Sequence, residues 1–304
     1  MKSDSVSIKH WRNPEMTNNW TIDFIKQEDF EAHVFATIQN YGKNLQPIDL
    51  KKFNSNIIDP IKMIFDKSIY NISWKELINN EIFRQRDKTN NNSIGYFHQR
   101  IFKYIKNCHV PENGKEGGWD VIYRNPNGIE LPDGNIVHTI FVEMKNKHNT
   151  MNSSAASKTY IKMQNQLLKN DDCACFLVEA IAKQSQNIKW TTTVDHEKVS
   201  HKFIRRVSLD QFYALVTGQP NAFYKICMKL PDTIEKILGN NTNDNYVEPP
   251  SDTAYFSLEH ISKNLDLQTH DIAMAMAIYL LGFGSYNGFK KHLIGLNTVN
   301  DFFE

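Results

Sequence analysis

Two alternating segments joined by turn residues constrain the fold of this chain most strongly. Residues 117–124 read GGWDVIYR and residues 140–147 read IFVEMKNK, and both alternate with the period of two that a β-strand imposes. Between them lie two runs typical of turns, Asn125-Pro126-Asn127-Gly128 and Leu131-Pro132-Asp133-Gly134. The pattern predicts a β-hairpin.

This hairpin would bring two carboxylates together. If the chain reverses near Pro132, residues equidistant from that point pair across the hairpin, and the midpoint of Asp120 and Glu143 falls between residues 131 and 132. Directly opposed residues have Cβ atoms about 4.5 to 5.5 Å apart, and like charges there destabilise a sheet unless a cation lies between them. The sequence therefore predicts a site for a divalent metal ion and a phosphate.

The later strand also supplies a lysine. Glu143 and Lys145 are two residues apart, so both side chains leave the same face. Because Mg²⁺ prefers oxygen ligands and keeps several waters, we expect Asp120 and Glu143 to bind it, with the Met144 carbonyl as a further ligand. Lys145 would stabilise charge on the phosphate or orient the attacking water. The alternative is an ordinary solvated ion pair between Glu143 and Lys145.

A second aspartate matches the written form of a nuclease signature. Pro132-Asp133 precedes Glu143-Met144-Lys145 as proline and aspartate precede Glu-x-Lys in that signature. However, Asp133 lies in the expected turn, and ten residues of extended strand would hold it roughly 30 Å from Glu143. We therefore expect Asp133 to form the turn and Asp120 to be the acidic ligand.

The residues of this hairpin resemble a known family. Asp120 with Glu143-Met144-Lys145 is similar to the active site of the PD-(D/E)xK nuclease superfamily. The longer runs GGWDV at 117–121 and VEMKNKHNTMNSS at 142–154 resemble type II restriction endonucleases that recognise GGNCC. The resemblance covers residues 90–210 best, and Trp119 stands where the superfamily often has proline. It implies an α/β core, Mg²⁺-dependent cleavage of double-stranded DNA, and catalytic roles for Asp120, Glu143 and Lys145.

The charge of the chain places any affinity for DNA in a local patch. There are 35 Lys and Arg against 34 Asp and Glu, a formal charge of +1, so no global cationic field attracts nucleic acid. From 143 to 169, five lysines stand against Glu143 alone, at positions 145, 147, 158, 162 and 169. Such a patch suits phosphate contacts, although lysine-rich helix faces are often merely solvated.

Guanine is most often read by Arg or Lys. The candidates here are Lys147, Arg205 and Arg206, and at most one of the two arginines should reach a base, because neighbours in a strand point to opposite faces. Lys158 and Lys162 lie four apart on an expected helix and so project together, toward a DNA backbone or into water. The residues expected to bind DNA are thus Lys147, Asn149, Lys158, Lys162, Arg205 and Arg206.

The fold class expected is α/β, a mixed central sheet flanked by helices, with helical N- and C-terminal elaborations. We expect a mainly helical region at 1–92, a nuclease core at 93–238 and a helical region at 246–304. Two asparagine-rich runs, at 79–80 and 89–92, predict a loop, with Ser93 capping the next helix. The run from Gly239 to Asn245, followed by Pro249-Pro250, predicts a linker.

Other features bear on compartment and assembly. The four cysteines lack zinc spacing and are expected to be reduced, and no signal peptide or apolar run of membrane length is seen, so we expect a cytoplasmic protein without membrane contact. The palindrome that the resemblance implies suggests a homodimer. Two other hypotheses stay open: a repair or junction nuclease specific for DNA structure, and a non-catalytic DNA-binding module.

Overall fold

The described residues fall into two compact units. The computed structural model describes residues 20–44, 46–148, 150–240, 252–283 and 292. One unit contains residues up to 33 together with 99–233, and the other contains 34–98 together with residues from 234 onward. These boundaries differ from the three consecutive regions expected from the sequence, because each unit is assembled from two separate stretches of chain.

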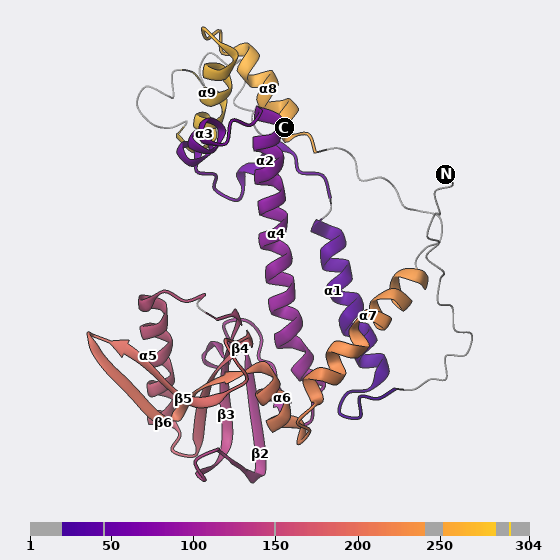
Figure 1. The fold of residues 1–304 in the computed structure, drawn as a ribbon, viewed down its shortest axis with the longest axis vertical. Coiled ribbons are helices and arrows are strands. Elements are labelled where there is room, and N and C mark those ends of the chain that lie inside the picture. The colour runs from indigo at the N-terminus through magenta and orange to yellow at the C-terminus, as the bar shows by residue number, and fades with distance from the viewer. Residues whose placement is uncertain (1–19, 45, 149, 241–251, 284–291, 293–304) are drawn as a thin grey trace, which may run out of the picture. The chain divides into compact units, whose positions relative to one another are not determined.

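The first unit contains a six-stranded mixed sheet with the order β1-β2-β3-β4-β6-β5 (Figure 1). Strands β3, β4 and β6 run parallel, and the pairs β1–β2, β2–β3 and β5–β6 are antiparallel. The strands are β1 Cys108–His109, β2 Val121–Glu130, β3 Ile136–Lys147, β4 Cys173–Ile181, β5 Asn187–Val194 and β6 Glu197–Ser208. The α/β class with a mixed sheet flanked by helices is confirmed.

Helices pack on both faces of this sheet. On one face, α5 (Ser153–Lys169) buries Tyr160 and Met163 completely among side chains of the strands, and its start is capped by Asn152, whose side chain accepts the Ala155 N–H. On the other face, α6 (Leu209–Thr217) places Phe212 6.5 Å from the Phe176 ring. A short 3-10 helix, η1 (Ile101–Tyr104), packs there against α6. The sheet is therefore buried on both sides, as parallel strands require.

The predicted hairpin is confirmed, with a bulge that the sequence did not predict. Pairs from Val121↔Val142 to Arg124↔Thr139 are centred between residues 131 and 132, as expected for Asp120 opposite Glu143. Nearer the turn, however, Ile129↔Val137 is centred on residue 133, because β2 is irregular between Arg124 and Ile129. The turn and the bulge together set the register. The midpoint near Pro132 gave the correct pairing of Asp120 with Glu143 although it took no account of the bulge.

The second unit is helical. It contains α2 (Leu50–Asn54), α3 (Pro60–Ile69), α8 (Ala254–Asn264) and α9 (His270–Phe283), with most of α4 (Trp74–Arg100). The buried side chains of these helices form one cluster, which includes Phe53, Trp74, Ile78, Leu258 and Met274. Two further helices, α1 (Gln27–Asn44) and α7 (Ala222–Asn240), contribute residues to both units.

The prediction of a loop through the asparagine-rich runs was wrong. Helix α4 continues through residues 79–80 and 89–92, and Ser93 lies buried inside it rather than at its start. Thr89 and Ser93 donate their hydroxyls to the carbonyls four residues earlier, at 3.0 and 3.1 Å. Bonds of this kind satisfy a hydroxyl within a helix, here including that of the buried Ser93. The buried residues on either side of the second run, Trp74 to Gln85 and then Ser93 and Phe97, lie on one helix face, and their packing outweighs the weak helix propensity of asparagine.

The remaining expectations about the chain are met in part. Gly239 and Asn240, expected at the start of a linker, end α7, and the rest of that run lies outside the described residues.

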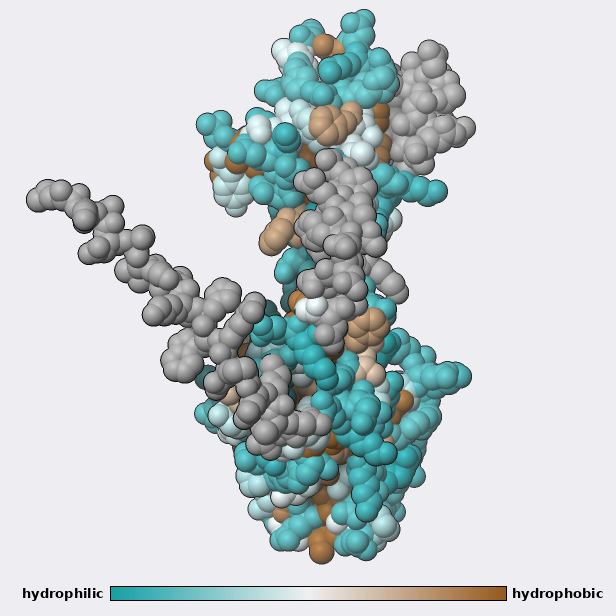
Figure 2. Space-filling model, turned by 90° about the vertical axis from the view of Figure 1, so that its right-hand side faces the viewer, coloured by the Kyte–Doolittle hydropathy of each residue, from teal (hydrophilic) through white to brown (hydrophobic). Residues whose placement is uncertain are grey.

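On the side that Figure 2 shows, hydrophilic side chains cover most of the described surface and apolar ones lie among them. None of the described helices is both long and apolar enough to span a membrane.

Candidate active site

The loop before Asp120 requires glycine twice. Gly117 and Gly118 have φ values of 78° and 67°, a left-handed backbone that glycine adopts without strain. This bend turns the Gly118 carbonyl toward helix α5, where it accepts a hydrogen bond of 2.7 Å from the Lys162 Nζ. The double glycine therefore directs the chain into β2, and the Gly118 carbonyl becomes a polar group of the site.

Asp120 lies at the start of β2 and is tied to β3 twice. Its N–H donates to the Val142 carbonyl at 2.9 Å, which extends the ladder one residue beyond the strand. Its carboxylate Oδ2 accepts the Met144 N–H at 2.7 Å. Because Val121 pairs with Val142, the next position along the ladder sets Asp120 opposite Glu143. The structure brings together the two acids that the sequence predicted.

Glu143 is held between two lysines. Lys145 Nζ donates to Oε1 and Lys162 Nζ donates to Oε2, each at 2.8 Å. Lys145 comes from the same strand and Lys162 from α5, which packs over this face of the sheet. Glu143 is 16 % exposed and each lysine 31 %, so both ion pairs are partly shielded from water and stronger than ordinary surface pairs.

The two carboxylates differ in acidity. Burial raises the pKa of Asp120 to about 6, and the charge of Glu143 adds to the rise, while the Met144 N–H and the two lysines oppose it. Burial would also raise the pKa of Glu143, but the hydrogen bonds from Lys145 and Lys162 outweigh it and lower that pKa. Both lysines influence both acids, so the four side chains form one electrostatic unit.

A second charged cluster follows along the same edge of the sheet. Glu179, 2 % exposed at its side chain, forms an ion pair with Arg206, and its other oxygen lies 3.3 Å from His148 Nδ1. Arg206 also lies 2.8 Å from that nitrogen. Glu179 pairs in register with Lys145, so the two clusters are neighbours. Sequence reasoning missed Glu179, although an acid alone in the apolar strand CACFLVEAI was a signal for it.

Comparison with known proteins gives the family of the chain. The sequence profile of the Eco47II restriction endonuclease family matches residues 22–239. The chain belongs to this restriction endonuclease family. It is 32 % identical to the type II restriction enzyme Sau96I of Staphylococcus aureus over 72 % of this chain and 82 % of that protein. It is 28 % identical to the type II restriction enzyme Eco47II of Escherichia coli over 71 % of this chain and 88 % of that protein.

The structure places the residues that the sequence predicted to bind DNA in different surroundings. Lys147 and Lys158 are exposed on β3 and α5, and Arg206 lies at the edge of the site. Lys162, expected at the DNA backbone, instead contacts Glu143. Arg205 and Arg206 do point to opposite faces. Asn149 lies outside the described residues.

Arg205 is committed to the fold. It is 4 % exposed, donates to the Asn187 side chain at 2.6 Å and its carbonyl at 2.7 Å, and lies 3.6 Å from Asp133. Asp133 itself lies in the hairpin turn, as expected, and is not near the acids of the site. Of the two arginines, Arg206 is therefore the better candidate for a DNA contact.

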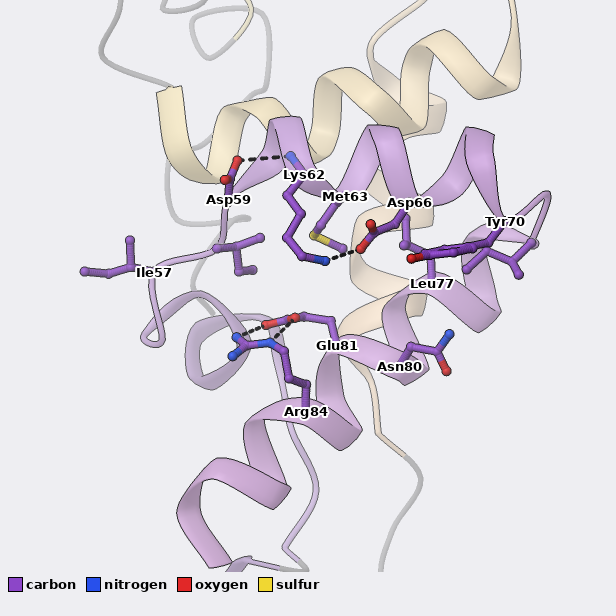
Figure 3. A pocket seen from close by; sticks show the side chains of 12 residues that line it. Ile57, Asp59, Lys62, Met63, Asp66, Tyr70, Leu77, Asn80, Glu81 and Arg84 are labelled. Carbon is purple, nitrogen blue, oxygen red and sulfur yellow. Dashed lines mark hydrogen bonds and ion pairs between the residues drawn. The ribbon is translucent and has the colours of Figure 1, made fainter. Parts of the chain in front are cut away.

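A separate pocket lies in the helical unit. It has a volume of about 480 Å³ and is lined by α3, α4 and the segment before α3 (Figure 3). Two ion pairs line it, Lys62 with Asp66 and Arg84 with Glu81, and its remaining charged side chain is the carboxylate of Asp59, which accepts the Lys62 backbone N–H at 3.1 Å. Because these pairs neutralise one another, the pocket offers little attraction to a phosphate, and the charged site on the sheet remains the candidate for catalysis.

Proposed function

We propose that this chain is a Mg²⁺-dependent type II restriction endonuclease that hydrolyses phosphodiester bonds of double-stranded DNA at the palindrome GGNCC and acts as a homodimer. The observation that carries the proposal is the register of the hairpin, which sets Asp120 opposite Glu143 with Lys145 beside it. The recognition sequence rests on the resemblance of residues 117–121 and 142–154 to enzymes that cut GGNCC.

The donor set fits a hard divalent cation. Asp120 and Glu143 offer carboxylate oxygens, the ligands Mg²⁺ prefers, and the raised pKa of Asp120 reflects in part the repulsion that a cation would relieve. Among the described residues, groups of three or more His, Cys, Asp or Glu that could hold a metal are absent, so waters and DNA phosphate would complete the shell. We propose the Met144 carbonyl as a further ligand.

Each residue has a separate task in the proposed reaction. The bound Mg²⁺ would polarise the scissile phosphate and lower the pKa of a water molecule. Lys145, held beside Glu143 at 2.8 Å, would donate its N–H groups to the phosphate oxygens as negative charge develops there. Lys147, Lys158, Arg206 and Asn149 would position the DNA through its backbone or read guanine.

Fragment mapping tests this function. Duplex DNA with several GGNCC sites is incubated with the protein and Mg²⁺, with EDTA as the control, and the fragment ends are sequenced. We expect ends only at GGNCC and only with Mg²⁺. Ends that follow junctions or flaps instead would favour a structure-specific repair nuclease. Binding without cleavage in Mg²⁺ or Mn²⁺ would favour a non-catalytic DNA-binding module.

A further inference from the structure

We infer that Lys162 is a second active-site lysine that acts as a positioning residue. In the metal-free protein it binds the Glu143 carboxylate, and it competes with the cation for that carboxylate. This inference rests on the proposed function, because it concerns the same metal site. The superfamily signature contains one lysine, here Lys145, whereas Lys162 comes from a different element, α5, and lies 19 residues after Glu143.

The contacts of Lys162 fix its ammonium group in one place. Nζ donates to Glu143 Oε2 at 2.8 Å and to the Gly118 carbonyl at 2.7 Å, and it lies 4.1 Å from the centre of the Trp119 ring. An ammonium group has three donors, and here two make hydrogen bonds while the charge rests on an aromatic face. A flexible lysine that merely covered the helix surface would not meet three such partners.

The scaffold around Lys162 is built to hold it. Trp119 is buried against Phe141, with ring centroids 5.5 Å apart, and its indole N–H lies 3.3 Å from the Gln166 side chain of α5. The bend at Gly118 presents the carbonyl that Lys162 needs. Packing from both the loop and the helix therefore converges on the ammonium group.

Charge balance gives the consequence for metal binding. Without Lys162 the site contains Asp120, Glu143 and Lys145, a net charge of −1, and with Lys162 it is neutral. A divalent cation that binds Glu143 must therefore displace Lys162 from Oε2 or bind beside its positive charge. Charges at contact distance interact strongly even at an effective dielectric constant of about 20, so this competition weakens the cation's affinity substantially.

Metal titration without DNA tests this inference directly. Mn²⁺ is added to metal-free protein, and the free ion is measured by electron paramagnetic resonance. We expect Lys162→Met to bind Mn²⁺ about tenfold more tightly than the parent. Lys162→Arg, which keeps the charge, should bind as weakly as the parent. Lys169→Met, which removes a lysine from the exposed end of α5, is the matched control for net charge and should change the affinity little.

An Asp120→Asn variant separates this inference from the proposed function. If Asp120→Asn abolishes the Mn²⁺ site while Lys162→Met binds no more tightly than the parent, competition by Lys162 is wrong and the metal site stands. If Asp120→Asn binds Mn²⁺ as the parent does, the metal site itself is wrong, and both proposals fall. Circular dichroism of each variant confirms folding, and Lys162→Gln replaces Lys162→Met if the latter does not fold.

Discussion

Two facing carboxylates with opposite shifts in pKa define the candidate site at the scale of single residues. Burial raises the pKa of Asp120, whereas the hydrogen bonds of two lysines lower that of Glu143 despite its burial. Pairs of acids whose environments separate their pKa values are typical of active sites. In the metal-free protein at neutral pH, Asp120 is the acid without a direct lysine partner, and its ionisation costs more free energy than that of Glu143.

The charge of Asp120 should lower the stability of the metal-free protein at alkaline pH. Its folded pKa of about 6 exceeds the ordinary value of 3.8, so its stabilising effect is complete only below about pH 4 and is lost as pH rises through 6. We expect Asp120→Asn to raise the free energy of unfolding by about 1 to 3 kcal/mol at pH 8. The gain should shrink toward pH 4.

Thermal unfolding of the parent and Asp120→Asn at pH 4, 6 and 8, in EDTA, measures this effect. A gain of a few degrees in melting temperature at pH 8 that vanishes at pH 4 is the expected pattern. A variant that melts at or below the temperature of the parent at pH 8 would show that the ionised carboxylate carries no such cost.

The sequence predicted some of these residues and not others, for a physical reason. Asp120, Glu143 and Lys145 follow from strand periodicity and a turn, both of which are local. Lys162 reaches Glu143 only because α5 packs across the sheet, and Glu179 meets Arg206 only because β4 and β6 are neighbours. Contacts between elements distant along the chain leave no periodic signal in a single sequence.

At the scale of elements, the bulge in β2 sets the register on which the site depends. Gly128 lies within the irregular stretch at φ 87°, and a Cβ there would approach Ile136 Cγ2 to 2.8 Å. Gly134, in the turn, has a similar φ of 78° but open space around it. Both glycines therefore need a left-handed backbone, but only at Gly128 would a Cβ collide with a neighbouring atom.

Alanine at these two positions separates backbone strain from collision. Both variants should lose about 1 kcal/mol from placing alanine in a left-handed conformation, and Gly128→Ala should lose roughly 1 to 3 kcal/mol more because either the Ile136 side chain or the hairpin backbone must shift. Chemical denaturation measures the difference. Equal losses at both positions would mean that the bulge yields easily and does not hold the register.

Glu179 should stabilise the end of the parallel strands through its two partners. Removing its charge leaves Arg206 and His148 without their acid, and the partly exposed Arg206 should recover some solvation, so we expect Glu179→Gln to cost about 1 to 3 kcal/mol. Glu130→Gln, at an exposed position of β2, is the control and should change stability by less than about 0.5 kcal/mol. Similar values for both variants would show that the cluster is only loosely held.

Helix α4 shows how an element can be misread from composition. Its asparagines at 79, 80, 91 and 92 are exposed, so their amides stay in contact with water, while packing of the buried positions stabilises the helix. The two strands of the hairpin and the helix that contains Lys158 and Lys162 were predicted correctly because their patterns are uninterrupted. For α4 the sequence offered little else as a guide, because this segment has almost no amphipathic periodicity and its buried positions include the polar Gln85 and Ser93.

At the scale of the whole molecule, the two units interleave along the chain, so no single boundary divides them. Amino-acid composition could not predict this division. The chain passes from one unit to the other at residues 33/34, 98/99 and 233/234, and these points lie inside helices α1, α4 and α7. The near-neutral charge of the chain also leaves DNA binding to the local basic residues around the site.

A homodimer is expected because one active site cuts one strand, and a palindrome offers two equivalent strands. Sedimentation equilibrium at micromolar concentration should give twice the 35.3 kDa mass of one chain. A mass of 35.3 kDa for the free protein at every concentration, together with one chain per GGNCC duplex in the complex, would contradict the dimer while leaving the hydrolytic site untouched.

The central claim is that Glu143, facing Asp120 across the hairpin, belongs to the centre that cleaves DNA. Its most direct test is the single-turnover rate of cleavage of a GGNCC duplex by the parent and Glu143→Gln in Mg²⁺, with equal DNA binding confirmed in EDTA. We expect the variant to bind this duplex and cleave it at least about 1,000-fold more slowly, as for loss of a group that acts in the transition state. Cleavage by Glu143→Gln at the parental rate would contradict the claim.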